Sequence, residues 1–432
     1  MSLRGKLWVM VLSGAIAVYA VIGGLPFVGS VLNANAQQTV NDAGAQLRIV
    51  ENVLQHIQND YVDVPDMEKV RVGSLRGLAN GLDPYSSFLT ADQVKEYQAT
   101  KGAMKTGIGA EFSQVQGFLY VISVVKGGPA EKAGIKSGDF IEYIDSKASR
   151  DVSLYDAIRA VSGDPGTSVA LRILRSGEKP QTIKVQRNTF ALPKPEARIE
   201  AGRVGVVKAY TLETGDSNEI KARIAELQKQ GISKLVLDLR GVAGGKLEEA
   251  AAVANLFIRD GDLAKVIGRG NSVVKVFTAD PSKALFTGDA AVLINLGTAG
   301  AAEAVAAAFL DQKRGEVVGE RSFGMGTQQE LFPVKSGDGF LLTVAKWASA
   351  NGITFLGEDR ATMGVKPSIE VKRPDTPEPL DIENVIENQG QPNAAPTPTP
   401  TPKPKVAPVL EDIQLKRAIE LLSGKADAAK AG

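Results

Sequence analysis

The spacing of hydrophobic residues divides the chain into segments, and the first is an almost unbroken apolar run over residues 7–32. Arg4 and Lys6 precede this run, and roughly 20 apolar residues are enough to cross a bilayer. Residues 34–36 also fit the Ala-x-Ala pattern of a cleavable export signal. We therefore expect residues 1–36 to be either a signal peptide or a membrane anchor. In both cases the rest of the chain would lie in the cell envelope, outside the inner membrane.

The next segment, residues 37–104, has the spacing of helices. His56 lies off the apolar face of the first helix and is expected to be a solvated residue. As the only histidine of the chain, it cannot build a multi-histidine metal site. The expected apolar face consists of Leu47, Val50, Val53, Leu54, Ile57 and Tyr61.

Residues 105–188 alternate as short strands with two predicted helices, one ending near Ala133 and one at 153–161 opened by Ser153. From residue 189 to 374, predicted strands at 204–210 and 234–240 flank a predicted helix at 217–230. This alternation is typical of a layered α/β domain.

The tail changes character after residue 374. Residues 375–408 are rich in Pro, Thr, Asn and Gln and predict a disordered linker. Within residues 409–432, a short amphipathic helix is expected to dock on this chain or on a second copy. Its apolar positions are Leu410, Ile413, Leu415, Ala418, Ile419 and Leu422.

Composition excludes several function classes. The 432 residues carry 50 Lys and Arg against 49 Asp and Glu, a net charge of +1, so no field attracts nucleic acid. The absence of Cys rules out disulfides and thiolate metal sites. No metal or other cofactor is expected. A hydrophobic content of 44% can supply cores for two or three domains.

Candidate chemistry is concentrated in residues 293–329. They read Leu-Ile-Asn-Leu-Gly-Thr-Ala-Gly-Ala-Ala-Glu and, later, Val-Val-Gly-Glu-Arg-Ser-Phe-Gly-Met-Gly-Thr-Gln-Gln. This region resembles the active site of the carboxyl-terminal processing peptidases, the S41 family of Ser-Lys peptidases. In that family a nucleophilic Ser stands at the position of Gly300, the base Lys at Met325 and an orienting Gln at Gln329. The resemblance implies a ClpP/crotonase-like α/β protease core at 189–374 behind a PDZ domain at 105–188.

The resemblance also implies two binding elements. Backbone N–H groups at Gly244 or Gly245, together with Ala301, would form an oxyanion hole; an ordinary tight turn is the alternative. In the PDZ domain, a carboxylate-binding loop and the second helix would hold a polypeptide C-terminus as an added strand, unless the domain is only a spacer. The residues concerned are Gly107, Ile108, Gly109, Ala110, Leu154 and Ile158.

A Ser-Lys peptidase needs a hydroxyl to attack and a neutral amine to accept its proton. Gly300 and Met325 provide neither, and a methionine fills the base position without the cost of an unpaired buried amine. We therefore expect an inactive family member that binds polypeptide C-termini, as a scaffold or as the partner of an active relative. Family members often assemble through terminal helices, which suggests a homodimer.

Two alternatives stay open. Thr298 or Ser322 could be a relocated nucleophile in an active endopeptidase that processes envelope proteins. Lys313, Lys335 and Lys346 are read as solvated surface charges. The protein could instead be purely structural, with both clefts occluded.

Overall fold

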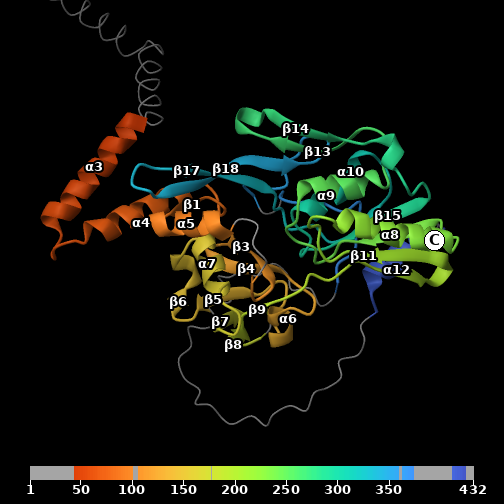
Figure 1. Ribbon diagram of the computed structural model, residues 1–432, viewed down its shortest axis with the longest axis horizontal. Helices are drawn as coiled ribbons and strands as arrows, with labels where there is room; N and C mark the ends of the chain where they lie inside the picture. The colour runs from red at the N-terminus through yellow and green to blue at the C-terminus, as the bar shows by residue number, and fades with distance from the viewer. Residues whose placement is uncertain (1–42, 101–105, 177, 360–361, 374–410, 425–432) are drawn as a thin grey trace, which may run out of the picture. The chain divides into compact units, whose positions relative to one another are not determined.

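The computed structural model describes residues 43–100, 106–176, 178–359, 362–373 and 411–424 (Figure 1). The chain divides into two compact units, residues 1–74 and 75–432. The predicted leading segment at 1–36 and the predicted linker at 375–408 lie outside the described residues. Within the described residues, no helix has the length and apolar character needed to cross a membrane.

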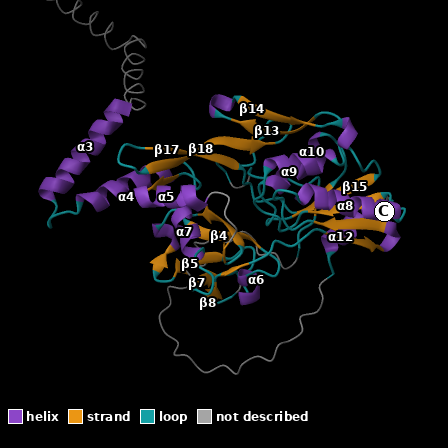
Figure 2. Cartoon of the chain, viewed as in Figure 1, coloured by secondary structure: helices purple, strands orange, loops and turns teal. Residues whose placement is uncertain are grey.

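The helical prediction for the N-terminal segment is confirmed by α3 (Ala43–Asp60), α4 (Met67–Asn80) and α5 (Ala91–Thr100) (Figure 2). A short strand, β1 (Ser87–Leu89), precedes α5. The predicted apolar face of α3 is largely exposed, with Leu47 67% and Val53 52% exposed. The His56 side chain is 78% exposed and bonds Asp60 at 2.6 Å, so it is a solvated residue as predicted.

The PDZ domain is built on a sheet with the order β3-β4-β5-β7-β8, to which β6 adds beside β5. The second predicted helix is confirmed as α7, where the Ser153 hydroxyl accepts a hydrogen bond from Asp156 N at 3.1 Å. Strands β2 (Thr106–Gly107) and β9 (Asn188–Thr189) pair where the chain enters and leaves the domain. The other elements are β3 (Ala110–Val115), β4 (Phe118–Val124), α6 (Pro129–Ala133), β5 (Phe140–Ile144), β6 (Lys147–Ala148), α7 (Leu154–Val161), β7 (Ser168–Leu174) and β8 (Gln181–Gln186).

The protease core contains a six-stranded sheet with the order β10-β11-β12-β15-β16-β19, parallel except for β10. Because successive strand residues face opposite sides, Leu235 and Leu237 pack in the cluster that includes α8, α9 and α10, whereas Val236 packs with α12. The elements are β10 (Glu196–Glu200), β11 (Val204–Lys208), α8 (Asp216–Lys229), β12 (Lys234–Asp238), α9 (Leu247–Asn255), β15 (Asp289–Ile294), α10 (Ala301–Asp311), β16 (Val317–Gly319), β19 (Ile369–Glu370) and α12 (Ile413–Leu422).

A second sheet has the order β1-β18-β13-β14, with β17 on β18. Its strands are β13 (Asp262–Ile267), β14 (Val273–Thr278), β17 (Thr327–Pro333) and β18 (Gly339–Ala348). Before β19, Val365 N donates to the Ser322 hydroxyl instead of to a neighbouring strand. Short 3-10 turns lie at Ser149–Asp151, Ala201–Arg203, Arg269–Asn271 and Pro281–Lys283.

Candidate active site

Gly300 lies between the end of β15 and the start of α10, in the position of a helix N-cap. Its φ of 65° and ψ of −117° belong to a backbone region that favours glycine. A Cβ atom built on Gly300 would lie 3.0 Å from the Gly244 carbonyl oxygen and 3.3 Å from Met325 Cε. The structure therefore brings Gly300 close to Met325, the two residues that the sequence analysis predicts at the positions of the nucleophile and the base.

Gly244 and Gly245 also lie against this helix start. The Ala301 N–H donates to the Gly244 carbonyl oxygen at 3.0 Å. A Cβ atom on Gly245 would lie 2.8 Å from the Leu212 oxygen and 3.1 Å from Ala301 Cβ, so only glycine fits there. The predicted oxyanion-hole residues are neighbours, but in this conformation the Ala301 N–H already has an acceptor.

Met325 is partly buried beside an apolar cluster that the PDZ domain and the protease core form together. The Tyr120 ring of β4 stacks on Phe323, with ring centroids 5.5 Å apart and an interplanar angle of 18°. Met325 packs at the margin of the same apolar cluster. Glu111 of β3 also reaches the site, because a Cβ atom on Gly244 would lie 3.4 Å from its carboxyl carbon. The buried members of the cluster are Phe118, Tyr120, Ile122, Phe140, Leu174, Ala299 and Phe323.

The structure also brings together the predicted peptide-binding residues. Ile108 is 2% exposed, and its carbonyl oxygen accepts a hydrogen bond from Ala130 N at 2.7 Å. A Cβ atom on Gly107 would lie 3.2 Å from Ser162 Cα, directly after α7. The loop then continues through Gly109 (φ 74°) and Ala110 into β3, which is an edge strand of its sheet. On α7, Leu154 is buried and Ile158 is 40% exposed.

A family profile for the PDZ domain matches residues 120–175, and one for Peptidase family S41 matches residues 203–371. The carboxy-terminal processing protease CtpA of Bacillus subtilis is 30% identical over 371 residues, covering 86% of this chain and 78% of that protein. The chain belongs to peptidase family S41.

Two further S41 comparisons agree. A probable CtpA-like serine protease of Staphylococcus aureus (strain MSSA476) is 30% identical, covering 89% of this chain and 75% of that protein. The solved structure of a photosystem II D1 C-terminal processing protease matches with a TM-score of 0.65 at 25% identity. That match covers 82% of this chain and 92% of the other. The predicted combination of helical segment, PDZ domain and S41 protease fold is confirmed.

Gln329, which the sequence analysis predicts as the orienting residue, lies on β17. Its amide nitrogen donates to the hydroxyls of Thr327 at 2.6 Å and Thr343 at 3.3 Å. The Thr343 hydroxyl in turn donates to Asp83 at 3.1 Å. Gln329 therefore ties β17 and β18 to the segment that precedes β1.

Glu303 is a central residue of this S41 site that the sequence analysis did not single out. Its carboxyl group accepts hydrogen bonds from Gly300 N at 2.8 Å, Met325 N at 2.8 Å, Gly324 N at 2.7 Å and the Ser322 hydroxyl at 2.5 Å. Burial raises the pKa of Glu303 to about 7, although these hydrogen bonds favour the charged form. A Glu three residues after a helix N-cap is a known capping signal and could have identified it.

The two hydroxyls considered as relocated nucleophiles are enclosed. Thr298 is 0% exposed, accepts a hydrogen bond from Asn295 N at 3.0 Å and donates to the Leu239 oxygen at 2.9 Å. Ser322 is 1% exposed and is held between Glu303 and Val365 N. Both hydroxyls serve internal hydrogen bonds in this conformation.

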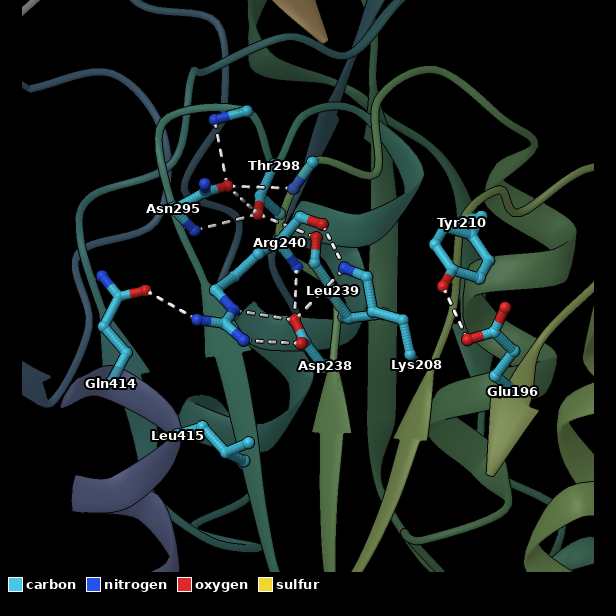
Figure 3. A network of polar contacts seen from close by, with 12 residues as sticks. Glu196, Lys208, Tyr210, Asp238, Leu239, Arg240, Asn295, Thr298, Gln414 and Leu415 are labelled. Atoms are coloured by element: carbon cyan, nitrogen blue, oxygen red, sulfur yellow. Dashed lines mark hydrogen bonds and ion pairs between the residues drawn. The ribbon is translucent and has the colours of Figure 1, made fainter. Parts of the chain in front are cut away.

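A polar network supports the turn after β12 from the opposite side (Figure 3). Arg240 lies between Asp238 and Asp412, with nitrogen–oxygen distances of 2.7 and 2.8 Å. Burial opposes the ionisation of Asp238, but Lys208 and Arg240 outweigh it and lower its pKa to about 2. Burial lowers the pKa of Lys208, against the attraction of Asp238.

This network reaches both the candidate site and the C-terminal helix. Asn295 accepts a hydrogen bond from Gly241 N at 2.9 Å, which fixes the start of the turn that carries Gly244. Gln414 of α12 donates to the Val371 oxygen at 2.8 Å. Within the described part of the chain, no group of three or more His, Asp or Glu residues could hold a metal ion.

Proposed function

We propose that this S41 protein is a non-catalytic family member that binds polypeptide C-termini through its PDZ domain. The observation that supports the proposal is the proximity of Gly300 and Met325, the two positions that the resemblance assigns to the family's Ser and Lys. Gly300 has no atom that can attack a carbonyl carbon, and a thioether is only a weak acceptor. The two replacements are compatible, since an apolar side chain covers the glycine.

The enclosed hydroxyls give no support to an active endopeptidase with a relocated nucleophile. Thr298 and Ser322 would each have to break two internal hydrogen bonds before reaching a substrate. Loss of one member of a nucleophile-base pair already removes most catalysis, and the remainder comes from binding and the oxyanion hole. Here the Ala301 N–H is also paired.

The binding half of the proposal rests on the glycine-containing loop beside an edge strand. Backbone N–H groups in such a loop can hold a terminal carboxylate, while the strand edge pairs with the ligand main chain. The partner would be a polypeptide with a free C-terminus, and the protein would act as a scaffold or beside an active relative. The basic and apolar residues of 1–36 support a location in the cell envelope.

Catalysis is tested by incubating an unfolded protein substrate with the full-length chain and with the double variant Gly300→Ser and Met325→Lys. The matched control is Gly300→Ala with Met325→Lys, which changes the same positions but adds no hydroxyl. We expect no cleavage by the native chain or the control, and cleavage by the Ser-Lys variant. Native cleavage that disappears in Thr298→Ala or Ser322→Ala would overturn the proposal.

Binding is tested separately with peptides that differ only in a free or an amidated C-terminus. We expect binding of the free form alone, because the loop N–H groups pair with a carboxylate. Equal binding of both forms, or of neither, contradicts the binding half.

A second candidate function is favoured by the packing beside Met325. The Tyr120 ring of the PDZ domain stacks on Phe323, and Met325 packs against the same cluster, as expected for a structural envelope protein that uses neither cleft. Absence of peptide binding together with absence of cleavage would support this candidate.

A further inference from the structure

A cavity of about 460 Å³ lies behind α7, between the PDZ domain and the helices that precede it. Its walls come from α4, α5, the turn that joins β5 to β6, and α7 itself. Figure 1 shows α5 beside α7, and Gln93 of α5 donates to Asp156 of α7 at 2.6 Å. Pockets for small organic molecules have volumes of roughly 300–1,000 Å³, so this cavity is large enough to hold one.

The cavity and the predicted peptide groove use opposite faces of α7. A helix turns by about 100° per residue, so Leu154 and Ile158 point to one side, and Asp156 and Arg159 to the other. Leu154 packs in the core of the PDZ domain, whereas Asp156 and Arg159 line the cavity. A molecule in the cavity would therefore occupy a site of its own, separate from that of a bound C-terminus.

Three cationic side chains line the cavity: Arg76 of α4, Lys147 of β6 and Arg159 of α7. Arg159 is paired with Glu96 at 2.5 Å. Lys147 is exposed, and its Nζ atom has no acceptor within the described part of the chain. Arg76 pairs with Asp156 through one terminal nitrogen at 3.3 Å, but its Nε–H meets no acceptor among the described residues. Arg76 and Lys147 thus have donors to spare.

The two carboxylates that line the cavity are held by donors of the protein. Asp156 accepts hydrogen bonds from the Gln93 amide at 2.6 Å and from the Ser153 hydroxyl at 3.1 Å. Asp145 accepts a hydrogen bond from Ala170 N at 2.9 Å. The polar groups that stay open are therefore mainly cationic donors, which favour a ligand that carries negative charge and accepts hydrogen bonds.

We propose that this cavity binds a small organic phosphate, with the phosphate group paired to Arg76 and Lys147. A guanidinium group matches the geometry of phosphate oxygens, and a lysine adds a compact charge. A phosphate monoester carries a charge of roughly −1.5 to −2 at pH 7, enough to pair with both cations. The organic part would lie against Ile144, Val152 and Ala160, the apolar residues of the wall.

The test uses phenyl phosphate, which joins a phosphate group to an apolar ring. Its binding to the full-length chain is measured by isothermal titration calorimetry, beside inorganic phosphate, which lacks the ring, and benzyl alcohol, which lacks the charge. The variants are Arg76→Gln and Lys147→Gln. The matched control is Lys184→Gln, which removes an exposed lysine from β8 of the same sheet.

Circular dichroism and thermal unfolding establish that each variant is folded. Lys147→Gln breaks no ion pair within the described residues, so it tests the site even where Arg76→Gln is unstable.

We expect the native chain and Lys184→Gln to bind phenyl phosphate equally, and more tightly than either other probe. Arg76→Gln should weaken binding by at least about tenfold, because a charged hydrogen-bonding group is lost. Lys147→Gln should weaken it by at least about threefold, the smaller effect of an exposed charge.

Absence of phenyl phosphate binding to the native chain would overturn the inference, and so would unchanged affinity in Lys147→Gln or an equal loss in Lys184→Gln. Binding of benzyl alcohol or inorganic phosphate as tight as that of phenyl phosphate would also contradict it, since the site would then not need both parts of the ligand. The proposed function is unaffected by each of these results, because the peptide groove lies on the other face of α7.

Discussion

Met325 Cε lies 3.3 Å from the position that a Cβ atom on Gly300 would occupy. The two residues are therefore in the spatial relationship expected of a nucleophile and its base, but they form an apolar contact instead of a hydrogen bond. The PDZ residue Tyr120 lies over the neighbouring Phe323. Met325 is thus part of the packing between the PDZ domain and the protease core.

Replacement of Gly300 by Ala should destabilise the protein through backbone strain, which costs roughly 1–3 kcal/mol at such a φ and ψ, and through contact with the Gly244 oxygen. The matched control is Gly270→Ala, which also has a positive φ (66°) but no atom within 4 Å of its Cβ position. Chemical unfolding should show a larger loss for Gly300→Ala. Equal losses would mean that the contact with Gly244 is easily relieved.

Replacement of Met325 by Lys should lower the free energy of unfolding by about 1–3 kcal/mol at neutral pH, because an ammonium group would enter an apolar cluster. Met325→Leu keeps the apolar contact and should cost less than about 1.5 kcal/mol. The difference between the two variants should shrink as the pH approaches about 10.4, where the lysine of the unfolded chain also loses its charge. A pH-independent difference would show that the lysine remains solvated.

Glu303 should make stability depend on pH between about 4.5 and 7. Its folded-state pKa of about 7 is raised above the ordinary value of 4.5, so the folded state binds more protons in this range. The contribution of Glu303 is therefore complete below pH 4.5 and is lost as the pH rises to 7, by roughly 3 kcal/mol.

The measurement is the free energy of unfolding of the native chain and Glu303→Gln across this pH range. The variant should be destabilised throughout, because its amide NH₂ would face N–H donors that now meet carboxyl oxygens. It should also lack this part of the pH dependence. Parallel curves for the two proteins would contradict the assignment.

Asp412→Asn should loosen α12, because Arg240 would lose one of its two carboxylate partners. We expect a cost of about 1–2 kcal/mol and faster amide hydrogen exchange over residues 411–424. Glu411→Gln removes a mostly exposed ion pair with Lys416 and should change stability by less than about 1 kcal/mol. Similar exchange rates in both variants would show that Arg240 does not hold the helix.

Local patterns were sufficient to predict much of the fold. The helical spacing of 37–104, the Ser153 cap of α7 and the amphipathic tail helix depend on neighbouring residues, and the structure confirms each. Local patterns do not indicate that the Val365 N–H donates to the Ser322 hydroxyl, because Ser322 is distant in the sequence.

The sequence by itself determined which atoms are present at the candidate site, because Gly300 and Met325 carry no hydroxyl or amine in any conformation. Only the tertiary structure decided how those positions are used. The pairing of Ala301 N–H with Gly244, the four donors around Glu303 and the docking of α12 on Arg240 join segments that are distant in the sequence. Residue spacing encodes which face of a helix or strand is apolar, but the direction of a peptide group and the partner of a buried charge depend on the path of the whole chain.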